Sequence, residues 1–206
     1  MRKLIAAAFV SLDGVMQAPG GPDEDPAQGF TFGGWTVPHW DEALTPFMDV
    51  FSQPFDLLLG RRTYDIFAAH WPRTPDDDPI GALFNRVTKY VATSSPDTLA
   101  WANSRAIAGD IPAGIAALKQ GDGPVLLTQG SAVLLHALLA HDLVDELRLM
   151  VFPVLLGCGK RWFDDTSRAG AFALETSATS ATGVVSSVYR RDGPVTTGSF
   201  ALDPSR

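Results

Sequence analysis

Apolar, strand-like runs alternate with helix-like segments along most of this 206-residue chain, and no other feature restricts the fold as strongly. Continuous apolar runs are typical of strands that are covered on both faces, as in parallel sheets. This alternation predicts an α/β fold with a mainly parallel sheet and helices on both sides. The predicted strands cover residues 3–10, 55–59, 89–92, 124–128 and 146–152, and the predicted helices cover residues 39–52, 63–69, 79–86, 111–120 and 131–141.

The C-terminal part of the chain has a different pattern. Residues 171–180 and 184–191 alternate polar and apolar side chains on either side of Thr182-Gly183. This pattern predicts an antiparallel hairpin that completes the sheet. Because the chain shows no internal repeat and no linker, we expect a single domain over residues 1–192, followed by a polar, frayed tail over residues 193–206.

Charge and composition exclude several kinds of partner. With 16 Lys and Arg against 23 Asp and Glu, the net charge is −7, whereas binding to a nucleic-acid backbone relies on clustered positive charge. No apolar run approaches the roughly 18 residues of a membrane-spanning helix. The single cysteine, Cys158, cannot form an intrachain disulfide and gives no sign of an oxidising compartment. We therefore expect no nucleic-acid partner, no membrane partner and a cytoplasmic location.

Common motifs for metals and nucleotides are absent. No Gly-x-Gly-x-x-Gly follows a strand, and Gly159-Lys160 lacks the upstream glycine of a Walker A loop. His136 and His141 are five residues apart, on different faces of a predicted helix, and His39 and His70 are isolated. The sequence therefore predicts no metal site.

Three predicted strands end in similar polar sequences: Gly60-Arg61-Arg62-Thr63, Thr93-Ser94-Ser95 and Thr128-Gln129-Gly130-Ser131. Open α/β sheets bind ligands at the carboxyl ends of their strands. Helix N-termini offer free N–H groups to phosphate, and arginines add positive charge. Together these ends indicate a site for a phosphorylated nucleotide. Ordinary turns, N-caps such as Ser131 and solvated arginines explain each end taken singly, so both interpretations stay open on the residues alone.

Several longer motifs carry a family resemblance. They are Ser11-Leu12-Asp13-Gly14, the segment 59–64, Thr93-Ser94-Ser95, Gln129-Gly130-Ser131, Asp145-Glu146-Leu147-Arg148 and the segment 152–164 with its Gly157-Cys158-Gly159-Lys160. With these motifs the chain resembles the dihydrofolate-reductase-like superfamily. Within it, the resemblance is to the C-terminal reductase domain of the riboflavin-biosynthesis deaminase-reductase. It runs through nearly the whole chain but includes no deaminase domain.

The resemblance implies a three-layer α/β/α fold of dihydrofolate-reductase type and NADPH as the cofactor. It implies an NADPH-dependent oxidoreductase that transfers hydride to a small heterocycle, such as the ribosylamino-pyrimidine reduced in riboflavin biosynthesis. Two alternatives are a non-catalytic NADPH-binding sensor or assembly protein and a dihydrofolate reductase. The acid that folate reductases carry before the second strand aligns here with Ala43, which disfavours folate reduction. A homodimer is expected because members of this branch commonly pair.

The resemblance also assigns the cofactor site. Arg61 and Arg62 would hold the 2′-phosphate side of the adenosine, and Thr63 the pyrophosphate. Ser94 and Ser95 would lie by the adenosine ribose and its phosphate. The other side of the pyrophosphate would be held by Gly130, Ser131 and Ala132. The nicotinamide pocket would be lined by Ala7, Ala8, Asp13, Gly14 and Val15. The full set of expected cofactor-binding residues is Ala7, Ala8, Gly14, Val15, Gly60, Arg61, Arg62, Thr63, Thr93, Ser94, Ser95, Gln129, Gly130, Ser131 and Ala132.

The remaining candidates concern the substrate side. Asp13 is the candidate general acid or proton relay, with a turn-forming aspartate as the alternative. Trp35, Trp40 and Phe47 are candidates for the wall of the substrate pocket, with ordinary core packing as the alternative. Residues 11–38 show no periodicity, and loops of this length are usually functional or disordered. We expect them to act as a lid over the nicotinamide and the substrate.

Overall fold

A computed structural model describes residues 1–41 and 48–201 of the chain, and its central feature is one 8-stranded sheet with the strand order β4-β3-β2-β5-β1-β6-β8-β7. The strands are β1 (Leu4–Ser11), β2 (Phe55–Gly60), β3 (Lys89–Ala92), β4 (Ser104–Ile107), β5 (Val125–Gln129), β6 (Glu146–Phe152), β7 (Phe172–Thr179) and β8 (Val185–Arg191). The α-helices are α1 (Arg61–His70), α2 (Pro79–Arg86), α3 (Ile111–Gln120) and α4 (Ala132–Ala140). Short 3-10 helices are η1 (Ala27–Gly29), η2 (Val37–His39), η4 (Trp71–Arg73) and η5 (Pro96–Thr98).

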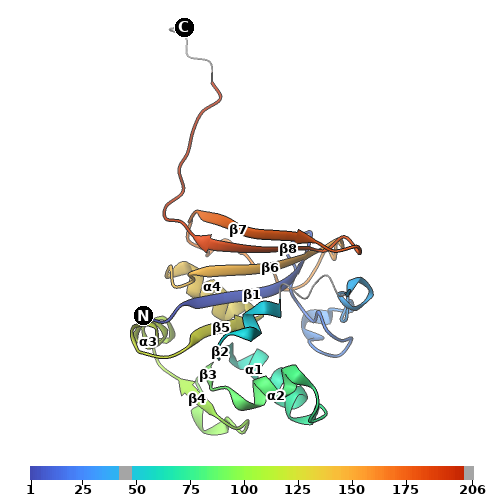
Figure 1. The fold of residues 1–206 in the computed structure, drawn as a ribbon, viewed down its shortest axis with the longest axis vertical. Coiled ribbons are helices and arrows are strands. Elements are labelled where there is room, and N and C mark those ends of the chain that lie inside the picture. The colour runs from blue at the N-terminus through green and yellow to red at the C-terminus, as the bar shows by residue number, and fades with distance from the viewer. Residues whose placement is uncertain (42–47, 202–206) are drawn as a thin grey trace.

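The direction of the strands confirms the predicted sheet. Strands β4, β3, β2, β5, β1 and β6 run parallel to one another. Strand β8 pairs with β6 in the antiparallel direction and with β7 as the C-terminal hairpin. In Figure 1, the hairpin forms one end of the sheet, and the chain that follows it extends away from the body of the molecule.

Two apolar cores cover the two faces of the sheet and make three layers (Figure 1). Alternate residues of β1 enter different cores, since successive strand side chains project to opposite faces. Ile5 and Ala7 face the core that includes Tyr64 of α1 and Phe84 of α2. Leu4, Ala6 and Ala8 face the core formed with α3 and α4. The three-layer α/β/α fold expected from the resemblance is therefore confirmed.

The structure corrects two details. The helix predicted over residues 39–52 is wrong in its described part, because residues 37–39 and 48–52 are 3-10 turns and residue 41 is irregular. In the sequence, Pro46 lies in the middle of the predicted helix, and a proline there lacks the N–H that continues an α-helix. Strand β4 was not predicted, because its four residues are partly exposed and show no apolar run. No helix in the described ranges is long and apolar enough to span a membrane.

A fully buried lysine lies where β3 meets the loop before β4. The Lys89 ammonium donates to the backbone carbonyls of Asn85, Val87 and Ala102 at 2.9, 2.9 and 3.0 Å. It also lies 4.3 Å from the ring centre of Trp101. Burial lowers the pKa of Lys89 from 10.5 to about 8. Three carbonyls replace the water that this charge loses, so the lysine joins three chain segments at a cost in desolvation.

The lowered pKa of Lys89 predicts a rise in stability at alkaline pH. The unfolded chain binds this proton more tightly than the folded one, so the free energy of unfolding should increase as the pH rises from about 8 to 10.5. The gain should reach up to about 3 kcal/mol. Urea unfolding of the wild type and of Lys89→Met across this range isolates the effect, because other titrating groups are common to both. Parallel pH profiles of the two proteins would contradict the prediction.

Candidate functional site

The polar ends of β2 and β5 meet at one edge of the sheet. Helix α1 begins directly after β2, and two residues separate the end of β5 from the start of α4. The Gly60 N–H donates to Ser131 Oγ at 3.0 Å and joins the two ends. Ser131 therefore does not cap α4 with its side chain as predicted; it has a left-handed backbone with φ of 60°. Two helix N-termini are thus brought to one place, which favours an anionic ligand.

Between the ends of β2 and β3 lies an open pocket of about 550 Å³. Its lining consists of Arg61, Asp65, Ala92, Thr93, Ser94, Ser95 and Thr98. The Arg61 Nη1 donates to Thr98 Oγ1 at 2.5 Å and to the Ser95 carbonyl at 3.3 Å. Its Nε donates to Asp65 at 2.9 Å. The pocket thus combines one guanidinium with several hydroxyl groups, which are donors suited to a phosphate.

Arg62 lies apart from this pocket, although it is adjacent to Arg61 in the sequence. Its guanidinium pairs with the carboxylate of Asp25, a buried residue in the long loop between β1 and β2. Lys160 pairs with the other oxygen of the same carboxylate. Burial alone would raise the pKa of Asp25, but the bonds from Lys160 and Arg62 hold it below its ordinary value. Of the two arginines, the structure therefore places only Arg61 in the pocket.

The long loop of residues 11–38 is packed against the sheet rather than free of it. Gln17 is its buried centre: Gln17 Nε2 donates to the carbonyls of Asp25 and Ala27 at 2.9 and 3.0 Å. The Trp35 indole N–H donates to the Gln17 carbonyl at 2.8 Å. The Lys160 N–H donates to Gln17 Oε1 at 3.0 Å. These bonds give the loop a defined shape and attach it to the segment after β6.

The residues expected around the nicotinamide separate into two groups. Ala7 lies on the face of the sheet that carries α1 and α2, whereas Ala8 points into the opposite core. Gly14 and Val15 join the segment after β6, where Val15 forms a bridge with Arg161 and is fully buried. The Gly130 N–H donates to the Ala7 carbonyl at 3.2 Å. A shared pocket can therefore be lined by the side chain of Ala7 but not by that of Ala8.

Gly130 lies close to the start of α1. Its φ is 72°, a left-handed conformation that glycine adopts without strain. A side chain at this position would point toward Met16 and Thr63, at 3.7 and 3.8 Å. Gly130 therefore brings the turn after β5 next to Thr63, so these two candidate residues lie side by side.

Asp13 is held as an anion. Burial alone would raise its pKa, but bonds from the Ser11 hydroxyl and from the Leu156 and Gly157 N–H groups lower it below the ordinary value. The Ser11 bond measures 2.6 Å and the Gly157 bond 2.9 Å. Its backbone carbonyl also accepts a bond from Arg161. These contacts connect the loop after β1 with the segment after β6, and they favour a positioning role over proton donation.

The three aromatic candidates have different surroundings. Trp35 is buried, and its ring packs edge-on against Phe152 at 5.3 Å between centroids. Trp40 is 47% exposed and packs edge-on against Phe9 at 5.8 Å. Phe47 lies outside the described residues. Of the two described candidates, Trp40 therefore presents a partly free ring surface near the carboxyl end of β1.

Sequence reasoning missed four polar residues that shape this region: Asp25, Asp65, Thr98 and Lys160. Asp65 had a usable signal, because it follows Arg61 by one helical turn. Asp25 had none, since Asp23, Glu24 and Asp25 are consecutive acids and only the fold buries the third. Among the described residues, no group of three or more His, Cys, Asp or Glu side chains is arranged to hold a metal.

A family model described as the RibD C-terminal domain matches residues 2–186 of this chain. The chain is similar to the uncharacterized protein YyaP of Bacillus subtilis (strain 168), with 28% identity over 201 residues. That match covers 93% of this chain and 96% of the relative. The similarity therefore extends over the whole fold rather than over one motif.

Solved structures share the same fold at low sequence identity. A putative riboflavin biosynthesis protein from Shewanella sp. PV-4 has a TM-score of 0.61 and 20% identity, with 92% of this chain and 99% of that chain covered. A dihydrofolate reductase from Enterococcus faecalis, complexed with NADP(H) and RAB-propyl, has a TM-score of 0.56 and 16% identity. It covers 92% of this chain and 96% of its own. The fold is therefore of the dihydrofolate-reductase type.

The two ion pairs of Asp25 predict that Asp25→Asn loosens the long loop. Loss of both charge-assisted bonds should lower the free energy of unfolding by roughly 1.5–3 kcal/mol at neutral pH. It should also increase protease cleavage within residues 19–28. Because the pKa of Asp25 is lowered in the folded chain, the difference from the wild type should begin to shrink as the pH falls below the ordinary value of 3.8 and disappear only below the lowered pKa. The exposed Asp23→Asn serves as the control, and equal effects of the two variants would refute the assignment.

Proposed function

The chain belongs to the RibD C-terminal domain family, and on that premise we propose that it is an NADPH-dependent reductase acting on a small heterocyclic substrate of the ribosylamino-pyrimidine class. One observation carries the proposal: Arg61 lies with Thr93, Ser94 and Ser95 in an open pocket at the carboxyl edge of the parallel sheet. That edge is where open α/β sheets bind nucleotides.

The residues present fit a phosphorylated dinucleotide. The pocket of about 550 Å³ is bordered by the Arg61 guanidinium, which pairs with Asp65, and by hydroxyl groups, and these N–H and O–H donors suit a 2′-phosphate. The N-termini of α1 and α4 adjoin at the bond between Gly60 and Ser131 and can share a pyrophosphate. At the end of β5, Gln129 Oε1 is buried without a hydrogen-bond partner in the described structure. A buried acceptor without a partner is unusual, and an N–H of a substrate ring bound beside the cofactor would satisfy it.

In the proposed complex, the chain itself binds, orients and excludes water. Arg61 binds the phosphate of the adenosine half, and Thr63 beside Gly130 contacts the pyrophosphate. The backbone of residues 13–15 is hydrogen-bonded to residues 160–162 and closes the nicotinamide end of the site. Bound NADPH would supply the hydride. Asp13 keeps the two closing segments together as a carboxylate, and the loop of residues 11–38 acts as the lid that shields the reacting groups from water.

A binding and turnover experiment tests the proposal. NADPH should bind the purified protein in titration calorimetry, and reduced nicotinamide absorbance should fall when ribosylamino-pyrimidines or related heterocycles are added. A protein that binds NADPH but oxidises it with no compound of this class would instead be the non-catalytic binding protein. A protein that does not bind NADPH would refute both.

The positions of the two adjacent arginines predict different effects on cofactor choice. Arg61→Gln should weaken NADPH binding about ten- to a hundredfold, because it removes a charge-assisted contact of roughly 1.5–3 kcal/mol to the 2′-phosphate. NADH, which lacks that phosphate, should bind almost unchanged. Arg62→Gln is the matched control and should leave NADPH affinity unaltered, since Arg62 is bound to Asp25. Calorimetric titration of both cofactors against the three proteins decides the matter.

The hydrogen bonds of Asp13 predict the behaviour of Asp13→Asn. NADPH affinity should be preserved, and the reductase rate should fall because the loop after β1 loses its charged anchor to residues 156 and 157. The shape of the pH–rate profile should stay the same. Loss of one limb of that profile, with a rate reduced about 10²–10⁴-fold, would instead identify Asp13 as the proton donor.

A further inference from the structure

Two charged side chains interrupt the apolar face of β6. Glu146, Arg148, Met150 and Phe152 are every second residue of the strand, so all four project to the same face. Met150 and Phe152 belong to the core on the side of α1 and α2. Glu146 is 2% exposed and Arg148 is 8% exposed. Burying charges costs several kcal/mol unless they are well paired, and apolar residues of similar volume often stabilise a fold as well or better. Stability alone therefore does not account for this pair.

Acidic side chains fix the position of Arg148 but do not use all of its hydrogen-bond donors. Its Nε donates to Glu146 Oε1 at 2.6 Å, and its Nη1 donates to Asp49. Glu146 is held in turn by Lys3. A guanidinium has five N–H donors, and within the described part of the chain Nη2 makes no hydrogen bond. The acids therefore set the orientation of a donor group that keeps free N–H bonds.

The sheet register places a second polar side chain opposite Arg148. Ala7 of β1 pairs with Gln129 of β5 on one side and with Arg148 of β6 on the other. Paired residues project to the same face, so Gln129 and Arg148 flank a single methyl group, two strand spacings or about 10 Å apart. We call these three residues the Ala7 row. Gln129 Oε1, the buried acceptor without a partner, belongs to it.

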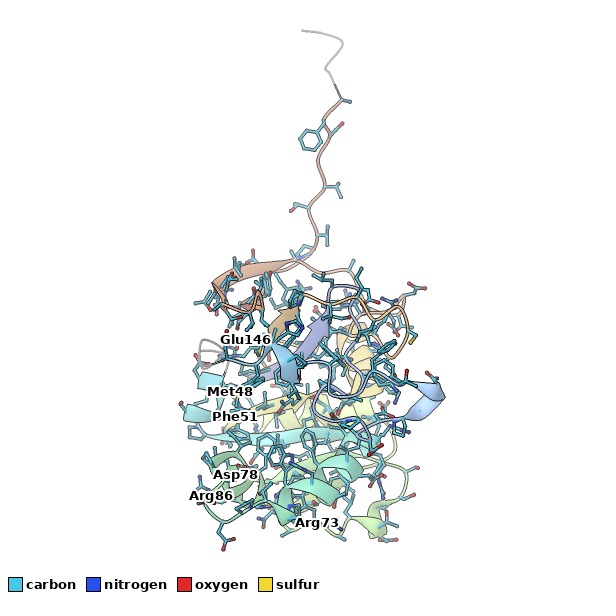
Figure 2. All side chains as sticks on the ribbon, turned by 90° about the vertical axis from the view of Figure 1, so that its right-hand side faces the viewer. Met48, Phe51, Arg73, Asp78, Arg86 and Glu146 are labelled. Atoms are coloured by element: carbon cyan, nitrogen blue, oxygen red, sulfur yellow. The ribbon has the colours of Figure 1, made fainter. Side chains whose placement is uncertain are left out.

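The surroundings of the Ala7 row are apolar. Phe9 follows Ala7 on the same face and packs edge-on against Phe152 at 5.8 Å. Met48 and Phe51 pack against the same core. Figure 2 labels these two residues together with Glu146 in a view across the sheet. An apolar floor with two polar groups at opposite edges is the usual form of a site that orients a small planar ligand.

We propose that Arg148 is a specificity-determining residue of the reductase: it donates to a ring carbonyl of the substrate, and Gln129 binds the opposite edge of the ring. The proposal rests on the proposed function and defines its substrate class. Arginine can only donate, so it requires an acceptor at its edge of the ring, and the acceptor of this proposal is a carbonyl oxygen. The Gln129 amide can present either its oxygen or its NH₂ group, so it can bind a donor or an acceptor on the ring. The substrate is therefore a lactam-type heterocycle.

Two neutral rings that differ by one oxygen test this selection. Isocytosine carries the ring carbonyl, and 2-aminopyrimidine lacks it. In the presence of saturating NADPH, NMR titration of the wild type should give isocytosine about a ten- to hundredfold tighter dissociation constant. Arg148→Gln should abolish this preference without changing NADPH affinity. Gln129→Leu should weaken both rings and leave the preference intact.

Controls separate recognition from folding. Arg190→Gln removes a half-exposed arginine of β8, paired with Glu175, and should behave as the wild type. If Arg148→Gln does not fold, Arg148→Lys keeps the charge but not the planar fork, and should reduce the preference. Equal affinities of the two rings, binding of neither, or a preference that survives both Arg148 variants would overturn the proposal. If the wild type does not bind NADPH, the proposed function is refuted instead.

Discussion

The position of β5 between β1 and β2 is the constraint on which the site depends. Because all three strands run parallel, their carboxyl ends lie at one edge. The turn after β5 therefore meets the start of α1 on one side and β1 on the other. The bonds from Gly60 to Ser131 and from Gly130 to Ala7 record these two contacts. With β5 at an edge of the sheet, neither the shared helix N-termini nor the Ala7 row would exist.

Acids organise the basic residues around this edge. Arg61 is oriented by Asp65, Arg62 by Asp25 and Arg148 by Glu146. The chain has a net charge of −7, so acids outnumber basic residues and a carboxylate is available to pair with each of these arginines. Here each of these three arginines pairs with a different acid, although Asp25 also pairs with Lys160, and the pairs differ in burial. The exposed pair of Arg61 leaves it available to a phosphate, whereas the buried pair of Arg148 holds a donor in place.

Local signals explain which helices were predicted well. Helices α2 and α3 have the predicted bounds because Asp78 and Asp110 cap them and a proline occupies the first turn of each. Asp78 accepts from the Ile80 and Gly81 N–H groups at 2.9 and 2.8 Å. The prediction of a helix over residues 39–52 failed because it followed the spacing of apolar residues and gave too little weight to the prolines. Strand β4 was missed because an exposed edge strand needs no apolar pattern.

The sequence by itself determined the strands other than β4, their polar carboxyl ends and the family. Those features are local, since an apolar run, a cap or a Gly-Arg-Arg-Thr motif can be read within a few residues. Only the tertiary structure decided that Arg61 and not Arg62 reaches the pocket, because Arg62 pairs with Asp25, 37 residues away. The same holds for Gln129 and Arg148, which lie on different strands and flank Ala7 on the same face of the sheet. Coulomb attraction depends on distance in space, so neighbours in the sequence can pair with different partners and have separate roles. Strand register aligns residues of different strands, so residues distant in the sequence can form one site.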